Sequence, residues 1–156
     1  MKTYVGIDPG QKGGIAFITP EYNKVSVFAM PIAGKDIDVS VIKILFTNWA
    51  IGDVVVAIEK VHSMPGQGVS STFKFGFGTG ILHGIVRTLE FPLHLVTPQK
   101  WKKIVLEGTT KDKAAAIDFC SRVYPNVNLL ATSRSRVPHD GMADAICIAR
   151  YAEISL

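Results

Sequence analysis

The chain has 156 residues and a formal net charge of +4, and 47% of its residues are hydrophobic. This length fits one domain, with a core large enough to fold without disulfide or metal staples. The apolar stretches end well short of a membrane span, and the first residues form a strand pattern rather than a secretion signal. Cys120 and Cys147 lie among apolar residues without metal-ligand spacing, so we expect reduced, buried thiols and a cytoplasmic protein.

Periodicity predicts three short strands joined by tight turns, followed by alternating helices and strands. The strands span 3–8, 13–19, 24–30, 53–59 and 93–96, the helices span 38–49, 70–89, 110–124 and 140–154, and a flexible loop spans 62–68. This order predicts one α/β domain over 1–156: a mixed five-stranded sheet, with three antiparallel strands and then parallel additions, and helices on both faces. That is the ribonuclease H-like arrangement.

Carboxylates mark three separated elements of this predicted domain. Asp8 ends the first strand, Glu59 ends the fourth, and Asp140 and Asp144 share one face of the last helix. The first and fourth strands would be neighbours, so Asp8 and Glu59 should lie side by side. Acids gathered in this way suit hard cations such as Mg²⁺, and two such ions can drive phosphodiester hydrolysis.

Each acid also has a local interpretation. Asp8 could form a turn before Pro9, Glu59 could be a surface charge at a strand end, Asp140 could cap its helix, and Asp144 could be solvated. His62 and His139 lie near Glu59 and Asp140 in the sequence. Either histidine could be a general acid, an extra metal ligand, or neither.

A basic segment lies between positions 100 and 113, and it is either a solvated face or a phosphate-contact surface. Its lysines are Lys100, Lys102, Lys103, Lys111 and Lys113, with Trp101 as the expected apolar anchor of a basic loop. Three phenylalanines in the 70–89 helix favour the core or a subunit interface over base stacking. They are Phe73, Phe75 and Phe77, and the glycines at 76, 78, 80 and 84 suit the close helix approach of a dimer seam.

Taken in order, these motifs resemble those of the RuvC-type Holliday junction resolvases over nearly the full length. The matching segments are Gly6–Gly10, Ala57–Glu59, Thr97–Lys102, Lys111–Lys113 and Asp140–Ala145. The resemblance implies a homodimeric endonuclease that needs Mg²⁺ or Mn²⁺, with two ions per active site, and that places symmetrical nicks in four-way DNA junctions. By position it implies metal ligands at Asp8, Glu59 and Asp144, and DNA contacts at Lys102 and Lys113.

The sequence departs from the family pattern at two places. Bacterial members usually carry an acid or a histidine three residues before the last aspartate, where this chain has Gly141, so Asp140 is the preferred fourth ligand over His139. The loop after Glu59 often carries an aromatic wedge, and this chain offers His62 and Met64 there as DNA contacts. Both departures are typical of a bacteriophage-like or divergent member.

Three alternatives remain at this point. A related nuclease could act on other branched DNA or on structured RNA with the same acids. A non-catalytic junction-binding protein would need a lost acid, and none is missing. A sugar-kinase or actin-like ATPase would need two such domains, and the chain lacks a G-x-x-x-x-G-K-[ST] loop. A helicase or packaging machine could direct the enzyme, but no residue pattern identifies one.

Overall fold

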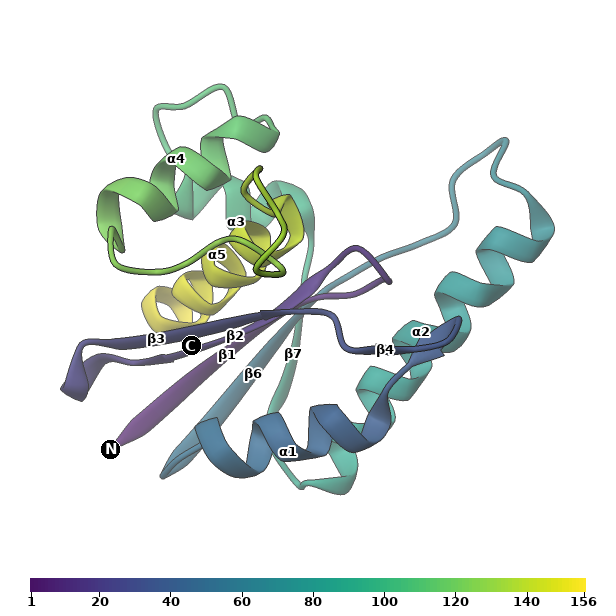
Figure 1. Ribbon diagram of the computed structural model, residues 1–156, viewed down its shortest axis with the longest axis horizontal. Helices are drawn as coiled ribbons and strands as arrows, with labels where there is room; N and C mark the ends of the chain where they lie inside the picture. Colours follow the sequence, from purple (N-terminus) through teal and green to yellow (C-terminus); the bar gives the residue numbers. More distant parts are fainter.

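The computed structural model describes all residues, 1–156, and its centre is a mixed sheet with helices on both faces (Figure 1). The strand order is β3 (Lys24–Ala29), β2 (Gly14–Thr19), β1 (Lys2–Asp8), β6 (Asp53–Glu59) and β7 (Leu93–Val96). The first three strands are antiparallel, whereas β6 and β7 run parallel to β1. The predicted α/β, ribonuclease H-like sheet is therefore confirmed, including the adjacency of the first and fourth predicted strands.

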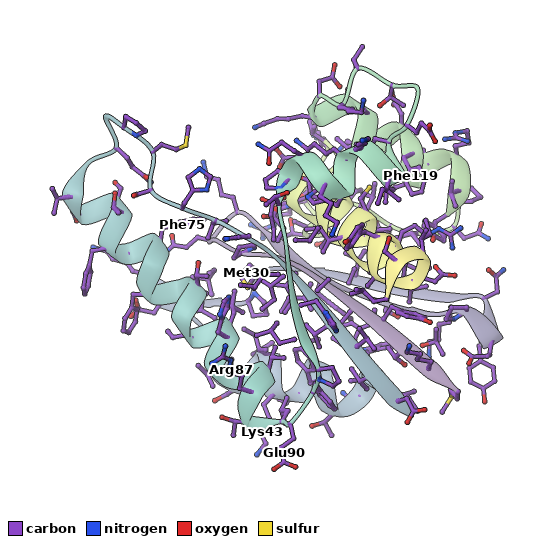
Figure 2. All side chains as sticks on the ribbon, turned by 180° about the vertical axis from the view of Figure 1, so that it is seen from behind. Met30, Lys43, Phe75, Arg87, Glu90 and Phe119 are labelled. Carbon is purple, nitrogen blue, oxygen red and sulfur yellow. The ribbon has the colours of Figure 1, made fainter.

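Two helical layers cover the sheet. The helices α1 (Val39–Trp49) and α2 (Val69–Thr88) cover one face, and α3 (Pro98–Val105), α4 (Lys113–Val123) and α5 (Asp140–Ser155) cover the other (Figure 1). Figure 2 shows Phe119 in the layer of α3–α5 and Arg87 in the opposite layer. Each layer has its own apolar core because alternate strand residues point to opposite faces, such as Ile7 toward one and Gly6 toward the other. No helix is both long and apolar enough to cross a bilayer.

The prediction of a basic loop near position 100 is wrong, because these residues form helix α3. The Thr97 side chain caps this helix by accepting the Lys100 N–H, and Pro98 occupies the first turn, where its missing N–H costs nothing. Trp101 and Val105, four residues apart, bury one face of the helix. Trp101 is thus the apolar anchor that the sequence predicts, but it anchors a helix.

Short elements were also missed or displaced. The hairpin of β4 (Ile32–Ala33) and β5 (Asp36–Ile37) was missed, because its strands are too short to show a period. The 3₁₀ helix η1 (Pro20–Tyr22) lies in the tight turn predicted between the second and third strands. Helix α4 begins at Lys113 rather than at 110, because Asp112 accepts the N–H of Ala115 and caps the helix there.

Helix α5 lies directly on the backbone of β1. A Cβ atom at Gly6 would be 2.2 Å from the carbonyl oxygen of Ala145 and 2.2 Å from the nitrogen of Ala149, so only glycine fits under this helix. Small residues along α5 allow the close approach. The same packing buries Cys120 and Cys147 as free thiols, as predicted.

Candidate active site

Three of the predicted acids come together at one edge of the sheet. In the parallel pairing of β1 and β6, Ile7 is opposite Ile58, so the next residues, Asp8 and Glu59, leave the sheet at the same edge. The contact between α5 and β1 brings Asp144 to this edge as well, and all three side chains are partly buried. The acids are 51 and 85 positions apart in sequence, and the fold alone brings them together.

The three acids share a partly buried environment that disfavours their ionisation. Burial, reinforced by the charges of Glu59, Asp144 and Asp140, raises the pKa of Asp8 from 3.8 to about 8. Burial likewise raises the pKa of Asp144 to about 6, against the opposing effect of Lys102. The pKa of Glu59 is also raised, mainly by burial. Buried, clustered carboxylates with raised pKa values are typical of sites that bind a cation.

Asp140 has a different environment from the other acids. Its Oδ2 lies 3.2 Å from the Lys113 ammonium, and its Oδ1 accepts the N–H of Gly141 at 3.0 Å. Burial acts to raise the pKa of Asp140, but these partners outweigh it and lower the pKa overall. Asp140 is therefore an ionised acid at the rim that already holds a cationic partner.

The N-cap of α5 is His139, not Asp140. His139 Nδ1 accepts the N–H of Met142 at 3.1 Å, and Asp140 is the first helical residue. The interpretation of Asp140 as a capping residue is therefore wrong. This bond occupies Nδ1 of His139 and leaves Nε2 as the nitrogen with which His139 could serve as a ligand or an acid.

Gly141 explains the missing acid in the family pattern. A Cβ atom at this position would be 2.2 Å from the carbonyl oxygen of Lys12, in the turn between β1 and β2. No side chain fits there unless the turn moves. The first turn of α5 can carry its extra acid at position 140 but not at 141.

Trp101 contributes a hydrogen bond that sequence reasoning missed. Its indole nitrogen donates to Oε2 of Glu59 at 2.6 Å, and this bond acts to lower the pKa of Glu59. The available signal was that a buried tryptophan usually finds a partner for its N–H.

The predicted basic residues divide into two groups. Lys102 lies near enough to lower the pKa of Asp8, Glu59 and Asp144, and Lys113 contacts Asp140. The other predicted DNA-contact residues are exposed and form no ion pair with an acid. They are Lys100 and Lys103 on α3, Lys111 before α4, and His62 and Met64 in the loop before α2.

The donor set fits a hard divalent cation in its chemistry. Its ligand atoms are carboxylate oxygens, and the raised pKa values of Asp8 and Asp144 are what a shared cation would reverse. No three His, Cys, Asp or Glu side chains converge on one point at ligand distance in this structure. Holding a metal ion therefore requires side-chain rotation of these acids toward a common centre.

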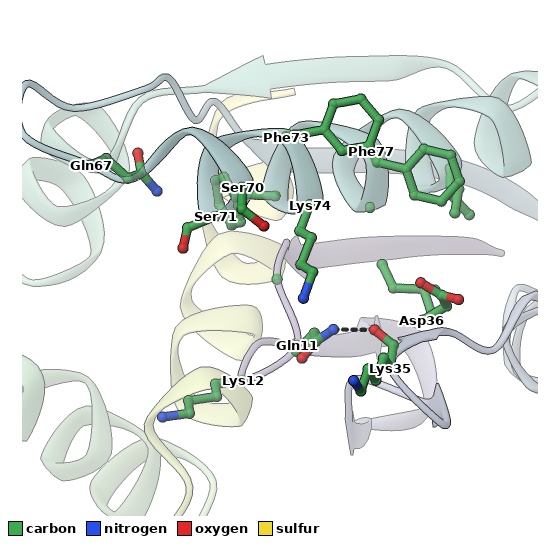
Figure 3. A pocket seen from close by; sticks show the side chains of 15 residues that line it. Gln11, Lys12, Lys35, Asp36, Gln67, Ser70, Ser71, Phe73, Lys74 and Phe77 are labelled. Carbon is green, nitrogen blue, oxygen red and sulfur yellow. Dashed lines mark hydrogen bonds between the residues drawn. The ribbon is translucent and has the colours of Figure 1, made fainter.

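A groove of about 1030 Å³ lies beside the acids, between α2, the β1–β2 turn and the β4–β5 hairpin (Figure 3). Its polar wall includes Gln11, Lys12, Lys35 and Lys74. Phe73 and Phe77 border it, are 73% and 55% exposed, and stack with ring centroids 6.3 Å apart. Of the two predicted locations for these rings, the core is therefore wrong, and a subunit interface stays a prediction.

Comparison with known proteins finds solved structures with a similar fold. No protein-family model and no curated protein sequence matches the chain. Thermus thermophilus RuvC matches it over 97% of this chain and 96% of its own, with 17% identity and a TM-score of 0.61. The same organism's RuvC in complex with Holliday junction substrate gives 14% identity and a TM-score of 0.62, over 98% and 96% of the two chains.

A third likeness comes from another kingdom. The yeast mitochondrial Holliday junction resolvase Ydc2 is 16% identical, with a TM-score of 0.57, over 93% of this chain and 75% of that one. The class that emerges is an α/β protein of the ribonuclease H-like type. Within that class, the particular arrangement is the RuvC-type resolvase fold.

Proposed function

We propose that this protein is a metal-dependent, structure-selective endonuclease that resolves four-way DNA junctions by paired, symmetrical nicks. The observation that carries the proposal is the cluster of Asp8, Glu59 and Asp144 beside Lys102. Burial raises the pKa of each acid, and the charges of neighbouring carboxylates raise those of Asp8 and Asp144 further. Acids held in this state suit phosphodiester hydrolysis assisted by divalent cations. No acid of the set is missing, which argues against a non-catalytic junction-binding protein.

In this proposal Asp8, Glu59, Asp144 and the rim acid Asp140 hold two Mg²⁺ or Mn²⁺ ions. When bound, such ions supply Lewis-acid activation of water and neutralise charge on the phosphodiester. Trp101 fixes one oxygen of Glu59 and leaves Oε1 free to turn toward a ligand.

The lysines around the acids act on the DNA. Lys102 lies among the three central acids and balances part of the negative charge that a phosphate brings to the site. Lys113, which pairs with Asp140, is free to exchange that carboxylate for a phosphate, because its side chain is 86% exposed. The exposed Lys100, Lys103 and Lys111 would extend the phosphate-contact surface along α3 and α4.

We further propose that two copies pair through α2. No atom lies within 4 Å of a Cβ built at Gly76, Gly80 or Gly84, and Phe73 and Phe77 share this uncovered face by helical spacing. Positions 73 and 84 are equally far from the midpoint of the segment 73–84, and so are positions 77 and 80. In an antiparallel pair, Phe73 would therefore lie against the partner subunit's Gly84, and Phe77 against the partner subunit's Gly80, which is a self-complementary contact.

End-labelled DNA tests the proposed reaction. A four-way junction, a matched duplex and a three-way fork are incubated with the protein in Mg²⁺, in Mn²⁺ and in EDTA. We expect metal-dependent paired nicks in the junction, and an Asp8→Asn variant that binds the junction but does not cut it. Asp53→Asn is the control, because Asp53 is an exposed acid at the other end of the strand that carries Glu59.

The other outcomes are informative. Equal cutting of forks would replace the junction resolvase with a broader branched-DNA nuclease. Cutting in EDTA, or at full rate by the Asp8→Asn variant, would contradict the assignment of the site.

A further inference from the structure

We infer that the groove between α2, the β1–β2 turn and the β4–β5 hairpin binds an unpaired DNA strand that leads away from the active site. This inference rests on the proposed function, because it names a second part of the same DNA path. The groove lies on the α2 side of the acids and shares no lysine with the α3–α4 segment.

The β1–β2 turn forms the boundary between the acids and the groove. On one side, its Lys12 carbonyl oxygen is so close to α5 that a Cβ at Gly141 would be 2.2 Å away. On the other side, a Cβ at Gly10 would be 3.1 Å from the ring of Phe75 on α2. The turn that follows Asp8 is thus held between both helices, and a strand leaving the acids over this turn would enter the groove.

The charge of the groove suits a phosphate backbone. Lys12, Lys35 and Lys74 line it from three different elements and are exposed, while Asp36 is the only acid among the lining residues. None of the three lysines forms an ion pair with an acid. Three cations against one carboxylate, on converging walls, would attract a polyanion.

The walls are also fixed relative to one another. The Gln11 side-chain nitrogen donates to the backbone carbonyl of Lys35, which joins the turn to the hairpin (Figure 3). In the same view Lys74 points from α2 toward Gln11 and Lys35, whereas the ring of Phe73 points the other way. Phe73 and Phe77, which we assign to the dimer, also line this groove, but the ring of Phe73 lies on the side of α2 away from the lysines.

The size of the groove suits a short stretch of single-stranded DNA. Its volume of about 1030 Å³ is on the order of that of a few nucleotides. Gln67, Ser70 and Ser71 add side-chain donors and acceptors that can reach the edges of unpaired bases. Basic grooves that follow a single backbone are the usual design of proteins that bind unpaired strands.

Binding measurements in EDTA test this inference without cleavage. The triple variant Lys12→Gln, Lys35→Gln, Lys74→Gln is compared with Lys2→Gln, Lys24→Gln, Lys43→Gln, which removes equal charge outside the groove. Fluorescence anisotropy with a 20-nucleotide single strand and with a matched duplex is recorded across a salt series. Thermal melting first checks that both variants remain folded.

We expect the groove variant to bind the single strand at least about tenfold more weakly, with a salt slope shallower by about 2, as for three lost phosphate contacts. Duplex binding should change less than about twofold, and the control variant should retain single-strand binding. Equal losses for duplex and single strand, or equal losses in both variants, would overturn the inference. If the groove variant loses single-strand binding but the original protein cuts no junction, the proposed nuclease function is overturned and the groove assignment stands.

Discussion

The indole nitrogen of Trp101 donates a 2.6 Å hydrogen bond to Oε2 of Glu59, so one residue belongs to the core and also holds an acid of the candidate active site. The ring itself is fully buried beneath α3. The first turn of α3 is thereby connected to the strand end that carries Glu59. The orientation of this acid depends on the packing of a neighbouring helix.

We predict that Trp101→Phe raises the Mg²⁺ concentration needed for half-maximal junction cleavage severalfold, while junction binding in EDTA changes little. Phenylalanine keeps most of the buried ring but lacks the N–H that holds Glu59. Metal titrations of cleavage rate measure the effect, and Mn²⁺ binding followed by electron paramagnetic resonance gives a second readout. Trp49→Phe, on α1 in the opposite layer, is the control. An unchanged metal requirement would mean that the bond does not orient Glu59.

The second prediction concerns pH and stability without metal. The folded protein binds the Asp8 proton with a pKa of about 8, against 3.8 for the ordinary group, so between these pH values the folded state holds more protons and loses stability as pH rises. Asp8→Asn removes this loss. At pH 8 in EDTA we expect the variant to be more stable by on the order of 1–2 kcal/mol, or roughly 3–6 °C in Tm.

The same melting curves contain their own control. The difference in Tm between Asp8→Asn and the original protein should shrink toward zero near pH 3, where Asp8 is protonated in the folded state and largely so in the unfolded chain. Added Mg²⁺ should stabilise the original protein at pH 8 and have little effect on the variant. A Tm difference that does not depend on pH would contradict the raised pKa.

The third prediction uses the ion pair between Lys113 and Asp140. Lys113→Gln removes the cation that occupies Asp140, so we expect cleavage to need less Mg²⁺, although junction binding in EDTA weakens severalfold through the lost phosphate contact. Stability should change by less than about 0.5 kcal/mol, because the lysine is exposed. Lys111→Gln is the matched control, since Lys111 pairs with no acid. A higher Mg²⁺ requirement would exclude Asp140 as a ligand.

The fourth prediction addresses Gly141. Replacing it with aspartate introduces the acid that the resemblance to RuvC-type resolvases leads us to expect near this position, but the Cβ would be 2.2 Å from the Lys12 carbonyl oxygen. We expect Gly141→Asp to lose about 2–4 kcal/mol in urea denaturation and to gain no activity, because the β1–β2 turn must move. Gly108→Asp tests a glycine with open space around it but with a positive φ of 77°, and a smaller loss is expected there. Full stability of Gly141→Asp would show that the turn yields easily.

The fifth prediction separates the dimer from the monomer fold. Gly80→Ala should favour the helix itself by about 1 kcal/mol, because Gly80 has open space around it in one chain. The added methyl group would nevertheless hold two α2 helices apart and weaken the dimer. Analytical ultracentrifugation across protein concentrations measures the pairing, with Gly68→Ala, just before α2, as a control outside the contact. Unchanged association would move the interface away from this face.

The sheet and the central acids could be predicted from the sequence because they depend on long, regular patterns. The apolar run ending at Glu59 and the run ending at Asp8 predict buried strands, and sequence order makes them neighbours. Helix α3 was missed because the helix is short and three lysines mask its apolar residues, Trp101 and Val105. The alternative interpretation of Asp140 as the helix cap is wrong because His139 takes that role, although aspartate is the commoner capping residue.

Features that depend on three-dimensional proximity could not be read from the chain. The bond between Trp101 and Glu59 crosses 42 positions, and no local pattern announces it. The groove is assembled from a turn, a two-residue hairpin and one side of α2, and its lysines are scattered from position 12 to position 74. Tertiary contacts bring such residues together, whereas sequence patterns report only on single elements.

The contact of α5 with Gly6 has a consequence for how this active site can diverge. The helix meets the strand through main-chain atoms of Ala145 and Ala149, so the spacing of Asp8 and Asp144 does not depend on the shape of large interlocking side chains. Most of the surrounding core can then be exchanged, provided that a few positions stay small. A shared fold at only 14–17% identity is what such a backbone-defined scaffold permits.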